Sequence, residues 1–113
     1  MNSIDEVFSD LRAIMVTAAG RQVVTVDKPG RLVVRSCDVD GSTGELAWFG
    51  TVTVKDDCVA YNLMPLYGDA GLDAAVPPSL QAVRHGSTCF RFQHKDVALF
   101  AELSALTQAA DRI

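Results

Sequence analysis

Residues 46–64 read LAWFGTVTVKDDCVAYNLM, and this stretch decides the fold. Apolar and β-branched residues fill it over 46–54 and again over 59–64, as is typical of strands. The short polar break KDD between the two runs suits a hairpin turn. We therefore predict two antiparallel strands, joined as a hairpin, near the centre of the chain.

A second hairpin is predicted before this one. The β-branched residues at 23–26 and the run at 32–35 flank the segment 27–30, which reads DKPG. Proline fixes φ and glycine supplies positive φ, so these four residues predict a turn. A polar, glycine-rich loop from Asp38 to Gly44 then leads to the central hairpin.

A helix is predicted at the start of the chain. Apolar residues recur at steps of three and four over residues 4–18, which is the spacing of one helix face. Ser3 and Glu6 form a capping box, and Gly20 ends the pattern. We place this helix at about residues 3–19.

The second half of the chain is predicted to hold two helices and one strand. Residues 65–75 are irregular because proline and glycine interrupt them, and a helix then starts at the Pro77-Pro78 pair and closes at Gly86. A short strand follows over 88–92. Asp96 can cap a final helix, whose broad apolar stripe begins at Leu99.

This order is helix, four antiparallel strands, helix, strand, helix, without the alternation that builds a parallel sheet. We predict an α+β fold, a two-layer sandwich with an antiparallel sheet, as one domain over residues 1–113. The predicted core comprises Leu11, Val34, Val52, Leu63, Phe90, Phe92, Phe100 and Leu103.

Charge and cysteine content exclude several classes of partner. Ten basic and fourteen acidic side chains give a net charge of −4 without a basic block, so nucleic acid is not expected. The longest uncharged stretches, 58–68 and 74–83, are shorter than the ~20 residues of a membrane span. Three cysteines cannot all pair, and no secretory signal is recognised, so we expect a cytoplasmic protein without a disulfide framework.

The second half also carries a family resemblance. It rests on the run YNLMPLY at 61–67 and on downstream positions: Pro78, Leu80, Gly86, Cys89, Phe90, Phe92, Leu99, Phe100, Glu102 and Leu103. Over roughly residues 59–108 the chain resembles a bacterial family of uncharacterised small proteins related to the YdhG-like domain. The broader group resembles frataxin-like and YjbR-like two-layer folds. That resemblance implies iron delivery as one alternative function.

Two groups of residues could carry metal or nucleophilic chemistry in loops and strands. The segment Asp38–Glu45 offers alternating oxygen ligands but fails the EF-hand spacing, so we expect a solvated loop. His85, Cys89 and His94 could bind a soft metal or act as nucleophiles, but their spacing matches no metal motif. We expect a core thiol and two surface imidazoles.

The first helix carries a third candidate group. Asp5, Glu6 and Asp10 would form the carboxylate ridge that a frataxin-like iron carrier needs. Carboxylates near a helix start also simply complement its dipole, and Arg12 dilutes the ridge. We therefore predict no catalytic residue, no metal ligand and no cofactor.

Apolar residues around the central hairpin indicate a binding surface instead. Strand 59–64 is apolar on both alternating sides, although helices need cover only one. We expect Phe49, Tyr61, Met64 and Tyr67 to contact a ligand or partner at the uncovered sheet face and the 65–75 loop.

The leading hypothesis is a non-enzymatic binding or interaction module that forms a symmetric homodimer through its uncovered sheet face. A small molecule or another protein could also cover that face. The alternatives are a frataxin-like iron-binding or iron-delivery protein and an enzyme that depends on Cys89.

Overall fold

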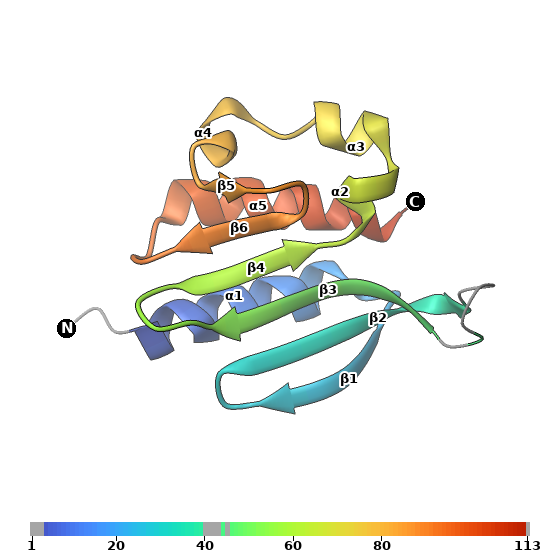
Figure 1. Cartoon of the computed structure of the whole chain (residues 1–113), viewed down its shortest axis with the longest axis horizontal. Helices are drawn as coiled ribbons and strands as arrows, with labels where there is room; N and C mark the ends of the chain where they lie inside the picture. The colour runs from blue at the N-terminus through green and yellow to red at the C-terminus, as the bar shows by residue number, and fades with distance from the viewer. Residues whose placement is uncertain (1–3, 40–43, 45, 113) are drawn as a thin grey trace.

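A computed structural model describes residues 4–39, 44 and 46–112 (Figure 1). The first half runs through α1 (Ile4–Ala18), β1 (Val23–Lys28), β2 (Arg31–Val39), β3 (Leu46–Val54) and β4 (Val59–Leu63). The second half runs through α2 (Pro65–Gly68), α3 (Ala70–Ala74), α4 (Pro78–Gln81), β5 (Arg84–His85), β6 (Cys89–Phe92) and α5 (Val97–Asp111). None of the helices in these ranges has the length and apolar character needed to cross a membrane.

The strands form one six-stranded sheet in the order β1-β2-β3-β4-β6-β5, and every neighbouring pair is antiparallel. The two long helices, α1 and α5, lie behind the sheet in the view of Figure 1. The fold is therefore a two-layer α+β sandwich, which confirms the predicted fold class.

The second half holds more short elements than the sequence pattern predicts. Asp69 accepts a hydrogen bond from the Leu72 backbone N–H at 2.8 Å and thereby starts α3 within the segment predicted to be irregular. The helix predicted from Pro77 to Gly86 is only the one-turn α4, because Arg84 and His85 pair with β6 as a strand.

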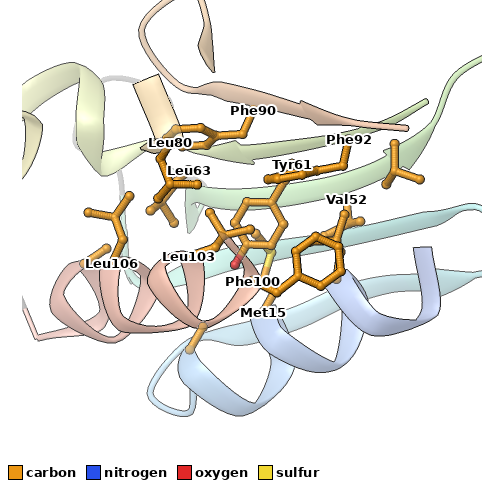
Figure 2. Close-up of a cluster of buried hydrophobic side chains, with 14 of the residues drawn as sticks. Met15, Val52, Tyr61, Leu63, Leu80, Phe90, Phe92, Phe100, Leu103 and Leu106 are labelled. Carbon is orange, nitrogen blue, oxygen red and sulfur yellow. The ribbon is translucent and has the colours of Figure 1, made fainter. Parts of the chain in front are cut away.

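The core lies between the sheet and the two long helices, and all eight residues predicted for it are buried. Figure 2 shows Tyr61, Leu63 and Phe92 pointing from the sheet toward α1 and α5. The rings of Phe92 and Phe100 meet edge to face, with their centroids 5.2 Å apart. Helix α5 is thus held to the sheet by aromatic as well as aliphatic contacts.

Gly50 lets α1 approach the middle of the sheet closely. A Cβ atom at this position would lie 2.5 Å from Met15 Cε on α1 and 2.8 Å from the Asn62 backbone oxygen. The Met15 tip can move aside, but the Asn62 oxygen belongs to the backbone, so any larger residue at position 50 would have to displace β4 relative to β3.

A β-bulge in β3 reverses the expected alternation of its side chains. Val34 pairs with Gly50 and Arg35 pairs with Trp48, so Phe49 is an extra residue on β3. The inserted residue shifts the alternation by one, which leaves Phe49 in the core at 2% exposure and Trp48 on the opposite face at 46%. The prediction that Phe49 lies on the uncovered sheet face is wrong for this reason.

Tyr61 is also part of the core, because Val59, Tyr61 and Leu63 alternate toward the helices. Its hydroxyl donates to Thr107 Oγ1 at 2.6 Å, and Thr107 donates to the Leu103 carbonyl at 2.9 Å. Burial raises the pKa of Tyr61 far above its usual range, so the buried hydroxyl stays neutral. The prediction that Tyr61 contacts a partner at the sheet surface does not fit its complete burial.

Candidate binding face

The sheet face turned away from α1 and α5 is called the open face below. Side chains alternate along a strand, and directly paired residues of antiparallel strands share one face. Because Leu32, Val34, Val52 and Phe90 belong to the core, their neighbours in sequence lie on the open face. The open face comprises Val23, Val26, Lys28, Arg31, Val33, Arg35, Trp48, Thr51, Thr53, Ala60, Asn62, His85, Cys89 and Arg91.

The open face is basic, although the whole chain is acidic. Lys28, Arg31, Arg35 and Arg91 lie on it, and none of its positions given above is a carboxylate. Ten basic residues less these four leave six against fourteen acidic residues for the rest of the chain. The fold therefore separates positive charge onto one sheet face.

Three of the four cations make no ion pair in the described part of the chain. The ion pairs there join Arg12 to Asp27, Arg84 to Asp73, and Lys95 to Asp10. Lys28, Arg31 and Arg91 are absent from these pairs, and all three side chains are exposed. Their charge is therefore available to a partner.

Arg35 and Trp48 form a fixed pair on the same face. The Arg35 guanidinium carbon lies 4.0 Å from the centroid of the Trp48 ring, within the range of a cation–π contact. These residues are directly opposite each other on β2 and β3. Stacking on the ring holds the guanidinium in place, so Arg35 is already ordered when a partner arrives.

Between these cations the open face carries small residues, some apolar and some polar. Val33 and Ala60 are each 2% exposed, and Thr51 and Thr53 are half-buried. Asn62 donates to Thr51 Oγ1 at 3.2 Å. The exposed large apolar side chains on the open face are Val23 and Trp48, at 40% and 46% exposure, whereas the large apolar residues of β4 point into the core.

The other two predicted binding residues lie beyond the end of β4. Met64 is half-buried, and its backbone N–H donates to the Phe49 carbonyl at 2.8 Å. Tyr67 on α2 is 82% exposed. The four predicted residues therefore do not form one surface, since Phe49 and Tyr61 are buried in the core.

The candidate thiol and imidazoles are brought together only in part. His85 and Cys89 are directly paired on β5 and β6, and Asn62 is paired with Cys89 on its other side. The Cys89 Sγ lies 3.9 Å from the Phe90 carbonyl, and both Cys58 and Cys89 are free thiols. His94 lies after β6 and shares with His85 a pocket of about 580 Å³, which Cys58 and not Cys89 lines.

The acidic residues of α1 do not gather as one set of ligands in the described part of the chain. Asp10 Oδ2 lies 3.2 Å from Lys95 Nζ, which pairs the last carboxylate of the predicted ridge with a cation, while Asp5 and Glu6 are exposed in the first turn. Within the described ranges no three His, Cys, Asp or Glu side chains gather as metal ligands.

The segment Asp38–Glu45 was predicted to be a solvated loop. Its residues 40–43 and 45 lie outside the described residues.

The basic character of the open face was missed by sequence reasoning because its cations come from β1, β2 and β6. A local signal did exist. Arg31 and Arg35 alternate with the core residues Leu32 and Val34, which places both arginines on the face opposite the core.

Comparison with protein-family models, curated proteins and solved structures finds no match for this chain. The resemblance to the YdhG-like family stays a prediction. Function must therefore be inferred from the site itself.

Proposed function

We propose that this chain is a non-enzymatic binding module whose open face holds an anionic partner. The observation that carries the proposal is the helix-free sheet face on which Lys28, Arg31 and Arg91 have no carboxylate partner among the residues that the structure describes. Guanidinium groups bind carboxylate or phosphate oxygens through two parallel hydrogen bonds, so exposed arginines on one face favour an anionic ligand.

The segment 65–75 belongs to the proposal as a second contact. Tyr67 offers an apolar ring with a polar tip at 82% exposure, which is a type of residue enriched in interfaces. Its position on α2 would let a partner that follows β4 extend past the sheet.

A different partner is favoured over a second copy of the chain. In a two-fold dimer through the open face the same patch meets its own copy, so Arg31, Arg35 and Arg91 would approach like charges without a carboxylate. The homodimer predicted from the sequence remains a prediction that sedimentation equilibrium can test.

The iron alternative gains no support from the carboxylates of α1, because Asp10 already pairs with Lys95.

The compartment that we propose is the cytoplasm. Cys58 and Cys89 are free thiols, and reduced thiols persist in reducing compartments.

Titration with poly-L-glutamate, at low ionic strength, tests the binding proposal. We expect Arg31→Glu and Arg91→Glu each to weaken binding about tenfold, because each loses an ion pair and adds a repulsion of similar size. Fluorescence of Trp48, the one tryptophan of the chain, reports binding at the open face directly.

The matched control is Arg112→Glu, which changes the net charge equally at the end of α5. It should leave the affinity within about twofold of the unmodified protein, apart from long-range effects that salt screens. Equal weakening by all three variants would contradict a site on the open face.

A further inference from the structure

A pocket of about 580 Å³ lies beside the C-terminal end of β6 and is called the β6 pocket below. Its lining comes from the turn before β4, the segment after α4, β5, β6, the link from β6 to α5, and the first turn of α5. Sites for small molecules occupy roughly 300–1,000 Å³. The β6 pocket is therefore large enough for a small organic ligand.

One part of this lining is an apolar wall. Ala82, Val83, Phe92 and Leu99 form it, and Phe92 is at the same time part of the core. An apolar group that contacts this wall leaves water, which stabilises the complex. The ligand is therefore expected to have an apolar body.

The rest of the lining carries both signs of charge. Arg91 and Lys95 are positive, and Asp57 and Asp96 are negative, so these formal charges cancel. A metal ion does not fit the lining, because no three His, Cys, Asp or Glu side chains in the described ranges gather as ligands. Balanced charges favour a ligand that itself carries one charge of each sign.

Two of the four charged groups already have partners. Lys95 pairs with Asp10, which does not line the pocket. Asp96 caps α5, where it accepts a hydrogen bond from the Leu99 backbone N–H at 3.0 Å. The ligand must therefore rely on the other two.

These two groups, Arg91 and Asp57, have capacity left for a ligand. The Arg91 guanidinium makes no ion pair or side-chain hydrogen bond with the described part of the chain. Asp57 Oδ2 accepts a long hydrogen bond from Gln93 Nε2, at 3.4 Å. The imidazoles of His85 and His94 also line the pocket and can add further hydrogen bonds.

One small ligand can bridge Arg91 and Asp57. The hydrogen bond places Asp57 beside Gln93, two residues after Arg91, and two residues of chain span at most roughly 7 Å. In an α-amino acid a single carbon atom separates the ammonium nitrogen from the carboxylate. With a hydrogen bond of about 2.8 Å at each end, it reaches between groups roughly 8 Å apart.

We propose that the β6 pocket binds an apolar α-amino acid as its zwitterion. The carboxylate binds Arg91, the ammonium group binds Asp57, and the side chain packs on the apolar wall. The inference goes beyond the proposed function, because it assigns a small-molecule site that shares only Arg91 and His85 with the open face.

The test compares L-phenylalanine with two analogues that each lack one charge. N-acetyl-L-phenylalanine lacks the ammonium group, and L-phenylalaninamide lacks the carboxylate. We expect phenylalanine to bind about fivefold more tightly than either analogue, because each analogue loses one ion pair. Amide chemical shifts of the ¹⁵N-labelled protein measure the affinities and show whether the lining residues respond.

Two variants assign the two charges. Arg91→Gln should weaken the binding of phenylalanine about fivefold and leave that of phenylalaninamide unchanged. Asp57→Asn should weaken phenylalanine equally and leave N-acetyl-phenylalanine unchanged. The matched controls Arg112→Gln and Asp56→Asn remove the same charges outside the pocket, so they should keep all three affinities within about twofold. Circular dichroism confirms that the variants are folded.

Equal affinity of the unmodified protein for phenylalanine and both analogues would overturn the zwitterion. Tighter binding of N-acetyl-phenylalanine than of phenylalanine would overturn the role of Asp57. Unmoved lining signals in a large excess of phenylalanine would overturn the site itself. None of these results touches the proposed function, which fails separately if poly-L-glutamate does not bind with dependence on Arg31.

Discussion

A Tyr61→Asp variant is expected to be largely unfolded at neutral pH. The substitution removes a fully buried ring, leaves the Thr107 hydroxyl without its donor, and puts an unpaired carboxylate in the core. An uncompensated buried charge costs several kcal/mol, and a domain of this size has only about 5–15 kcal/mol of stability in total. Urea denaturation followed by circular dichroism measures the loss.

The pH dependence of this variant supplies a second check. Burial disfavours the ionised aspartate, so its pKa in the folded protein should be raised above the unfolded value. The folded state then binds more protons than the unfolded state, and stability should fall as pH rises from mildly acidic to neutral.

Trp48→Asp is the matched control on the neighbouring strand. Trp48 is 46% exposed on the open face, so an aspartate there is solvated and the protein should remain folded. If Tyr61→Asp were as stable as Trp48→Asp, Tyr61 would belong to the surface, as the sequence analysis expected, and β4 would have the opposite orientation.

Truncation of Phe100 to alanine is expected to lower the free energy of unfolding by about 3–5 kcal/mol. Phe100 is 6% exposed and packs edge to face on Phe92, so the substitution leaves a cavity between α5 and the sheet. The midpoint of urea denaturation should fall, with little change in the slope of the transition.

Val97→Ala on the same helix serves as the control, because Val97 is 73% exposed. Its effect should stay within about 0.5 kcal/mol. A Phe100→Ala variant with the midpoint of the unmodified protein would mean that α5 packs on the sheet through another face.

The strands and the core were predictable because their signals are local. The alternation in β2, the turn with Gly30 at φ +81° and the apolar stripe of α5 each lie within a few residues of sequence. The eight predicted core residues are buried for this reason.

The orientation of Phe49 and Trp48 could not be predicted in the same way. The bulge that exchanges their faces exists only in the pairing of β3 with β2, and strict alternation along β3 gives the wrong answer. The clash that Gly50 avoids with Met15 of α1 is likewise a contact between distant segments.

The candidate binding face was hidden for a related reason. Lys28, Arg31 and Arg35 are interrupted by apolar core residues in the sequence, and the fourth cation, Arg91, comes from β6, far along the chain. The strand order places β2 and β6 on either side of β3 and β4, and this order brings Arg31 and Arg91 to the two ends of one row.

The most direct test of the open face as the binding site is an amide chemical-shift map of the ¹⁵N-labelled protein titrated with poly-L-glutamate. The account predicts that the largest changes fall on the amides of Arg31, Thr53, Ala60 and Arg91 and on the indole N–H of Trp48. Changes concentrated on α1 or α5, with these signals unmoved, would contradict it.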